Sequence, residues 1–188
     1  MEKTKTVRSK SNQNILDLVY ISIGAALIAI CSWINIPTLV PFTLQTFAVF
    51  FVLSLLGGER GTISTLVYVL LGAVGVPVFA GFSGGIGVLL GNTGGYIIGF
   101  ILMGIIYIVL TRIFGKKSVV KITALVIGLI ACYAFGTAWF MYAYTKDTGA
   151  VGLLTVLSWC VFPFIIPDII KLVLAFGISK RVEPAIIQ

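Results

Sequence analysis

Histidine is absent from the 188-residue chain, and charged residues make up only 10% of it. The chain therefore lacks the side chain that most often serves as general base, proton relay or transition-metal ligand. The three cysteines, Cys31, Cys132 and Cys160, lie far apart in apolar runs without metal-ligand spacing, so we expect them to pack in the interior. The sequence predicts no metal, no resident cofactor and no histidine-dependent enzyme.

Apolar residues make up 59% of the chain, and its mean hydropathy is +1.13. Soluble domains are closer to about 45–50% apolar and about 25% charged. The composition predicts an all-α integral membrane protein, with a basic cytoplasmic tail at residues 1–14 and one transmembrane domain in the lipid bilayer at residues 15–182. The net charge of +7 does not indicate nucleic acid as a partner, because the position of charges relative to the spans decides their role.

Apolar runs divide this domain into a predicted bundle of six transmembrane helices. We expect the spans at residues 15–37, 43–56, 62–76, 92–114, 122–144 and 167–178. Pro167 suits the first turn of a helix, so the last span is expected to begin there. Residues 77–90 are glycine-rich and are predicted to form a loop or re-entrant segment, and residues 151–160 a short helix at or near the outer surface.

Basic residues lie mostly on one side of these spans. They occur in the N-terminal tail, in the turns at residues 57–61 and 112–121 and after the last span, whereas the opposite loops contain only Lys146. The positive-inside rule therefore places both termini in the cytoplasm of a multi-pass protein of the cell membrane. The tryptophans fall at the predicted outer ends, as interfacial aromatic residues do: Trp33, Trp139 and Trp159.

Asp168 and Lys171 are the only acid and the only base well inside the apolar sequence from residue 151 to residue 179. A charged side chain at the middle of a bilayer costs about 2.5–3.5 kcal/mol on insertion scales. The i, i+3 spacing puts both groups on one helix face, where they can neutralise each other. Two interpretations follow: an ion pair that holds helices together, or a site for a polar ligand.

Uncharged polar residues at the same predicted depth favour a ligand site. Thr43 and Gln45 open the second span, and Asn92 and Tyr96 lie at the start of the fourth. Glycines beside them would let a ligand reach the backbone. Because a packing pair needs none of these groups, the sequence predicts a pocket with apolar walls and a few fixed polar groups, as in sites for small, partly apolar molecules.

Two glycine patterns are weaker signals. Residues 81–85 match the G-x-S-x-G pattern of serine hydrolases, but Ser83 would need a base, and only Lys171 is available. We therefore expect no catalysis there. Glycines also recur every four residues, which on a helix forms a smooth surface for close packing; they are Gly87, Gly91, Gly95 and Gly99.

Three separated segments have distinctive sequences: Pro41–Thr46 (PFTLQT), Gly91–Phe100 (GNTGGYIIGF) and Phe164–Lys171 (FIIPDIIK). Together they resemble the BioY family, the biotin-specific S components (substrate-capture subunits) of energy-coupling factor (ECF) transporters. The resemblance implies a six-helix S component that captures biotin from outside. A T component in the membrane and two ABC ATPases would then drive release inward. The family usually has proline at the position of Asn92.

The resemblance also implies roles for the polar residues of the pocket. The ureido ring of biotin has two N–H donors for Asp168 and a carbonyl acceptor for an amide such as Asn92 or Gln45. The carboxylate of biotin needs a cation, and Lys171 is the only one within the predicted spans. The two ends of biotin could equally be reversed.

Apolar walls and a lid complete the expected site. Trp33 and Tyr96 would pack against the thiophane ring and the alkyl tail of biotin. The loops at residues 35–42 and 77–90, the second of which contains Gly84, would cover the pocket and order around the ligand.

Small residues on the first span indicate a partner contact. Ala25 and Ala29 share one helix face at i, i+4, where small side chains allow close approach of helices. In ECF S components an alanine motif of this kind meets the T component, so the resemblance assigns Ala25 and Ala29 that role. Close packing within this protein's own bundle is the alternative.

Two other functions remain open on the sequence alone. An S component for thiamine or riboflavin would have the same fold with different pocket residues. A structural membrane subunit would use Asp168 and Lys171 only to hold helices together.

Overall fold

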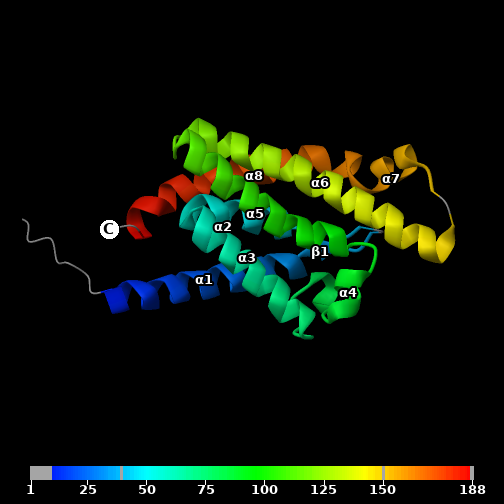
Figure 1. Ribbon diagram of the computed structural model, residues 1–188, viewed down its shortest axis with the longest axis horizontal. Helices are drawn as coiled ribbons and strands as arrows, with labels where there is room; N and C mark the ends of the chain where they lie inside the picture. The colour runs from blue at the N-terminus through cyan, green and yellow to red at the C-terminus, as the bar shows by residue number, and fades with distance from the viewer. Residues whose placement is uncertain (1–9, 39, 150, 187–188) are drawn as a thin grey trace, which may run out of the picture.

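The computed structural model describes residues 10–38, 40–149 and 151–186, and most of them are helical (Figure 1). The helices are α1 (Lys10–Trp33), α2 (Gln45–Leu56), α3 (Gly58–Ala73), α4 (Ile86–Leu90), α5 (Gly94–Phe114), α6 (Ser118–Thr148), α7 (Leu153–Cys160) and α8 (Phe162–Ile186). Two short strands, β1 (Asn35–Ile36) and β2 (Phe42–Thr43), pair antiparallel between α1 and α2. A 3-10 turn, η1 (Ala80–Phe82), lies between α3 and α4.

Four helical segments of the described chain are long and apolar enough to cross a membrane: Asn12–Trp33, Gly94–Phe114, Ser118–Lys146 and Leu153–Ala185. The helical membrane-protein class predicted from composition is thereby confirmed. Helix α2 has 12 residues, and at about 1.5 Å per residue it is shorter than the roughly 30 Å hydrocarbon core. Helix α3, with 16 residues, is short as well.

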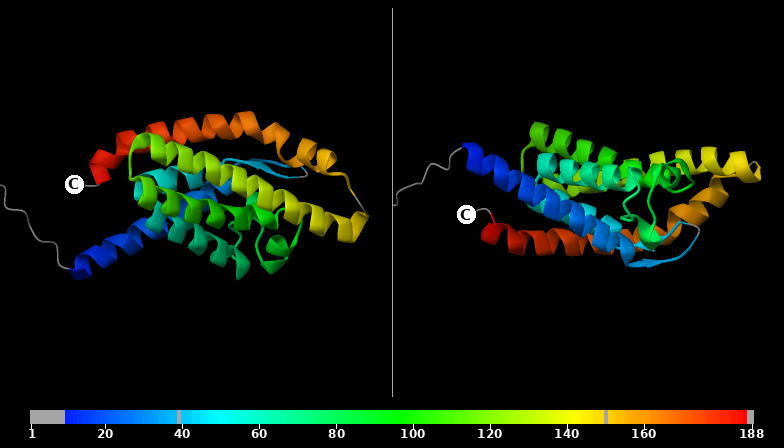
Figure 2. Two further views of the ribbon diagram at one scale, coloured as in Figure 1. Left: turned by 45° about the horizontal axis from the view of Figure 1, so that its top comes forward. Right: turned by 90° about the horizontal axis from the view of Figure 1, so that it is seen from below.

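The helices form one bundle in which α5 packs along α6, α2 along α8 and α1 along α3 (Figure 2). Helix α2 is apolar on every side, and eight of its residues are buried. A helix that is apolar all round belongs in an interior. The bundle core therefore surrounds α2, and the residues at its N-terminal end can meet side chains from several neighbouring helices.

Glycines allow α5 and α6 to approach closely. A Cβ atom on Gly95 would lie 2.2 Å from the Cβ of Trp139, and one on Gly99 would lie 2.8 Å from the Cys132 sulfur. The predicted packing role of Gly99 is thus confirmed. Gly87 belongs to α4 and Gly91 to the turn before α5, so the four regularly spaced glycines do not share one helix.

The last helix begins earlier than the sequence predicted. Helix α8 begins at Phe162 and contains Pro167 in its interior, so the predicted start at Pro167 is wrong. Pro163 lies in the first turn of α8, where a backbone N–H would have no intrahelical partner, so its absence costs nothing. Pro167 removes only one further backbone hydrogen bond. Asp168 consequently lies more than one turn inside the helix. The predicted short helix before it is present as α7.

The two ends of the bundle differ in what they contain. The start of α1 and the end of α8 lie at one end, whereas the β1–β2 pair, α4 and the connection from α6 to α7 lie at the other (Figure 1). The segments predicted to cover a pocket are thus gathered at the end opposite the start of α1 and the end of α8.

Candidate ligand-binding site

An ion pair is buried between α8 and its neighbours. Lys171 Nζ lies 2.8 Å from Asp168 Oδ1, one helical turn away. The two residues are 6% and 1% exposed. A charge buried to this degree is stable only when it is paired and hydrogen-bonded, so the surroundings of each group decide what the pair can do.

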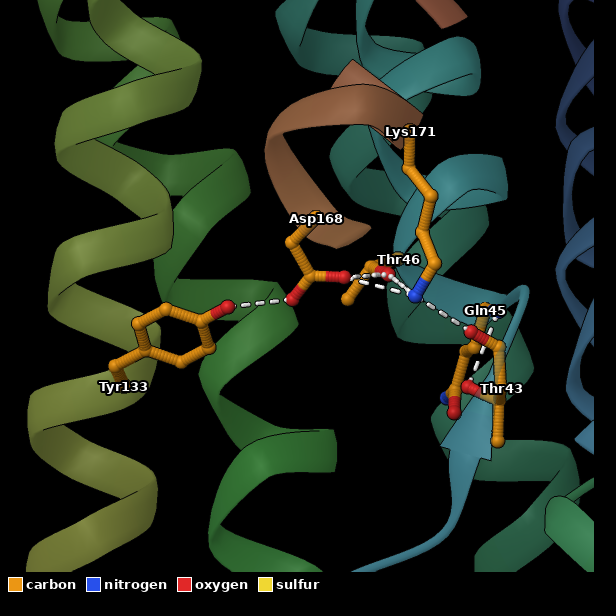
Figure 3. Close-up of polar contacts among 6 residues, drawn as sticks. All are labelled: Thr43, Gln45, Thr46, Tyr133, Asp168 and Lys171. Carbon is orange, nitrogen blue, oxygen red and sulfur yellow. Dashed lines mark hydrogen bonds and ion pairs between the residues drawn. The ribbon is translucent and has the colours of Figure 1, made fainter. Parts of the chain in front are cut away.

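Asp168 accepts hydrogen bonds from two further helices. Thr46 Oγ1 of α2 donates to Oδ1 at 2.8 Å, and Tyr133 OH of α6 donates to Oδ2 at 2.6 Å. In Figure 3 the carboxylate lies between Tyr133 on one side and Lys171 with Thr46 on the other. With Lys171, three donors from three helices hold the carboxylate in place by hydrogen bonds.

Lys171 uses all three of its N–H donors. Besides Asp168, Nζ donates to the Thr43 carbonyl oxygen at 2.8 Å and to Thr46 Oγ1 at 3.1 Å. The ammonium also lies 4.3 Å from the centroid of the Phe42 ring, close enough for a cation–π contact. Asp168 and Lys171 therefore form one polar network with the β2–α2 junction, and removal of either charge would leave the other unpaired.

A cavity of about 160 Å³ opens beside this network. Five residues predicted to bind a ligand line it: Thr43, Gln45, Tyr96, Asp168 and Lys171. Its apolar walls include Val40, Phe79, Val88, Ile97, Phe100, Leu129 and Phe164. Small-molecule sites typically have about 300–1,000 Å³, so this cavity must widen to hold a vitamin-sized ligand.

Neighbouring residues hold Gln45 and Tyr96 in position. Gln45 Nε2 donates to Tyr68 OH at 2.8 Å, and Tyr96 OH is 3.2 Å from Thr137 Oγ1. Both side chains are buried, so these bonds fix the amide and the phenol before a ligand binds.

Three predicted site residues do not line the cavity: Trp33, Gly84 and Asn92. Trp33 Nε1 instead donates to the Pro77 carbonyl oxygen at 2.9 Å, and its ring stacks on Phe82 at 5.0 Å between centroids. A Cβ atom on Gly84 would lie 2.5 Å from the Val76 carbonyl oxygen. Trp33 and Gly84 thus hold the loop after α3 in place, and Asn92 lies half-buried in the turn before α5.

The structure also corrects the expected partner contact on α1. Ala25 and Ala29 are only 3% and 6% exposed and belong to the hydrophobic core. These side chains cannot present a surface to another subunit, because their helix face packs inside the bundle. The opposite face of α1 is exposed and includes Ser22, Ala26 and Ile30.

Sequence reasoning missed Tyr133 and gave Thr46 no role of its own. Tyr133 places a phenol hydroxyl within an apolar helix, and this feature of the sequence could have identified it as a candidate. The chain has seven tyrosines, however, and only the packing of α6 brings this one to Asp168. Ser83 does line the cavity, and its hydroxyl donates to the Ala80 carbonyl oxygen of the same loop at 2.8 Å.

Known proteins share both the sequence and the fold. The model of the BioY family matches residues 3–188. The chain belongs to the BioY family. Family members named as biotin transporters include BioY of Thermotoga maritima, which is 41% identical over 180 residues, covering 88% of this chain and 95% of that protein.

Two further relatives extend the comparison. BioY2 of Lactococcus lactis, named a biotin transporter, is 33% identical over 171 residues, covering 89% of this chain and 91% of that protein. The crystal structure of the S-component for biotin from an ECF-type ABC transporter superposes with a TM-score of 0.80 at 27% identity, covering 94% of this chain and 95% of that one. The BioY fold therefore extends over nearly the whole chain.

Proposed function

We propose that this protein captures biotin and carries it across the membrane as the S component of an ECF-type transporter. The observation that carries the proposal is the Asp168–Lys171 network beside an apolar cavity within a fold shared with a biotin S-component. The names of its relatives, several of them biotin transporters, support the same ligand.

The chemistry of the cavity suits biotin. A carboxylate has about four lone-pair positions, and the described structure fills three of those on Asp168. A ureido ring has two N–H donors. One can bond to the remaining lone-pair position of Asp168, and the other can replace one of the three present donors. Lys171 has no N–H left over, so a ligand carboxylate would replace the Thr43 carbonyl or Thr46 as its acceptor.

Access to the cavity would come from the end of the bundle opposite the termini. Three of its lining residues, Phe79, Ala80 and Ser83, belong to the segment between α3 and α4, and Val40 and Pro41 belong to the β1–β2 connection. We propose that both segments move outward to admit biotin and then close over it. The small volume of the cavity supports such a step, because the loops would have to open before a ligand could enter. Loops of this kind become ordered as they close around a ligand.

We further propose that six spans cross the membrane and that both termini are cytoplasmic. In this arrangement α2 and α3 are short spans that their flanking segments complete. The common location of the α1 start and the α8 end supports an even number of spans (Figure 1). The basic residues at that end, among them Arg60, Arg112 and Lys116, support the orientation.

A T component and two ABC ATPases would supply the driving force, and the exposed face of α1 at Ser22 and Ala26 is the surface that we assign to the T component. Small residues on an exposed helix face allow another helix to pack closely.

Binding by the purified protein tests the ligand. Isothermal titration calorimetry should detect biotin but neither thiamine nor riboflavin. Biotinamide, which lacks the carboxylate, should bind more weakly than biotin, and Lys171→Met should reduce that difference. Absence of biotin binding by folded wild-type protein, or equal binding of the three vitamins, would overturn the proposal.

A further inference from the structure

A second, larger cavity lies at the end of the bundle that contains the start of α1 and the end of α8. Its volume is about 500 Å³, within the range of about 300–1,000 Å³ that is typical of small-molecule sites. It lies between the α2–α3 turn, the end of α5, the start of α6 and the end of α8. Its polar lining includes Ser54, Glu59, Arg60, Tyr107, Arg112, Lys116, Lys121 and Glu183.

Positive charge exceeds negative charge in this lining. Four basic side chains line the cavity and only two acidic ones: Arg60, Arg112, Lys116 and Lys121 against Glu59 and Glu183. Both acids are already paired, Glu59 with Arg112 and Glu183 with Lys121, and Arg60 is paired with Asp17 of α1. Lys116 has no ion-pair partner within residues 10–38, 40–149 and 151–186. The cavity is therefore suited to an anion.

Two buried hydroxyl groups in the same lining lack partners. Ser54 and Tyr107 are 2% and 1% exposed. Neither Ser54 Oγ nor Tyr107 OH has a hydrogen-bond partner in the part of the chain that the structure describes. A buried hydroxyl without a partner is destabilising, and an apolar side chain of the same shape would serve packing better. A ligand with several acceptor oxygens in the cavity would satisfy both groups.

Exposed apolar residues lie next to cavity-lining residues in the sequence of α5 and α6. Ile113, Phe114 and Val119 are exposed at the adjoining end of α5 and start of α6, where they would face the bilayer. A ligand for this place should combine an anionic, oxygen-rich head with an apolar tail. A phospholipid combines both, and basic pockets between transmembrane helices on the cytoplasmic side bind anionic lipid head groups.

We propose that this cavity binds the phosphate of an anionic phospholipid, with the acyl chains along Ile113, Phe114 and Val119. Lys116 and Arg112 would contact the phosphate oxygens, and Ser54 and Tyr107 would donate to the head group. The site is separate from the Asp168 cavity and does not depend on the identity of the ligand there.

Lipid retention by the purified protein tests the site. Native mass spectrometry and thermal unfolding would compare phosphatidylglycerol, phosphatidylcholine with the same acyl chains, and inorganic phosphate. Lys116→Gln should weaken phosphatidylglycerol binding about fivefold. Lys117→Gln is the matched control, because Lys117 is the neighbouring exposed lysine and does not line the cavity. Biotin binding should be unchanged in both variants.

Tyr107→Phe provides a second test that does not alter charge. Without lipid, loss of an unpartnered buried hydroxyl should leave the melting temperature unchanged or raise it. With phosphatidylglycerol, the stabilisation should fall below that of the wild type. Equal behaviour of Lys116→Gln and Lys117→Gln, or equal stabilisation by phosphatidylcholine, would overturn the proposal. Full stabilisation by inorganic phosphate alone would also overturn it. So would stabilisation by a partner protein when no lipid has any effect.

Discussion

At the scale of single residues, Asp168 is the group on which the candidate site depends most. Asp168→Asn keeps the size of the side chain but leaves the Lys171 ammonium buried without an anion, which costs about 3–5 kcal/mol of stability. Biotin affinity should fall by about one to two decades because charge-assisted hydrogen bonds are lost. Calorimetric titration and thermal unfolding on the same sample measure both effects.

The double variant Asp168→Asn/Lys171→Met separates folding from binding. Removal of both charges avoids an unpaired ion, so stability should recover toward that of the wild type. Biotin binding should remain lost. If the stable double variant bound biotin like the wild type, the pair would have only a structural role.

Tyr133 provides a milder test at the same site. Tyr133→Phe removes one donor to Asp168 Oδ2 and keeps the ring. A hydrogen bond to a charged group contributes about 1.5–3 kcal/mol, so the free energy of unfolding should fall by about this amount while the protein stays folded. Biotin affinity should fall about tenfold, because Tyr133 no longer holds the carboxylate in position. Tyr142→Phe is the control, because Tyr142 is exposed and lies outside the cavity. A normal affinity in Tyr133→Phe would exclude this phenol from the site.

At the scale of elements, the segments above the cavity should respond to ligand. Ile36 of β1 and Ile86 at the start of α4 are both exposed, whereas the three native cysteines are buried. Biotin should slow the reaction of Ile36→Cys and Ile86→Cys with a polar thiol reagent, because closure covers them. Lys117→Cys, exposed at the other end of the bundle, should react equally with and without biotin. Labelling that ignores biotin at both test positions would contradict a moving lid.

The two faces of α1 predict opposite phenotypes. Ala29→Trp inserts a large ring into the core and should cost about 1–3 kcal/mol or more, lowering stability and biotin binding together. Ala26→Trp changes an exposed position and should leave both unchanged while ATP-driven uptake falls. Reconstituted transport with the partner subunits measures the last effect, and wild-type uptake by folded Ala26→Trp would remove this face from the coupling surface.

At the scale of the whole molecule, the proposed orientation can be tested through the chain ends. Cysteines added at both termini should be protected from an impermeant reagent in intact cells and should react after lysis. Lys146, in the last turn of α6, is the counterpart, and Lys146→Cys should react in intact cells. Labelling of one terminus without the other would contradict an even number of spans.

The amino-acid sequence by itself determined the membrane class, the approximate helices and the pairing of Asp168 with Lys171. These features are local, because an apolar run requires a helix in lipid and two charges one turn apart face each other. The BioY resemblance also came from contiguous segments. For these reasons Thr43, Gln45 and Tyr96 could be assigned to the pocket before the structure was known.

Only the tertiary structure decided which side chains meet across helices. Tyr133 reaches Asp168 because α6 lies beside the start of α8, and Ala25 and Ala29 are buried because that face of α1 turns inward against α2 and α3. The rotation of one helix relative to its neighbours depends on packing along the whole bundle. Helical spacing alone shows that residues share a face, whereas what that face contacts depends on the distant segments packed against it.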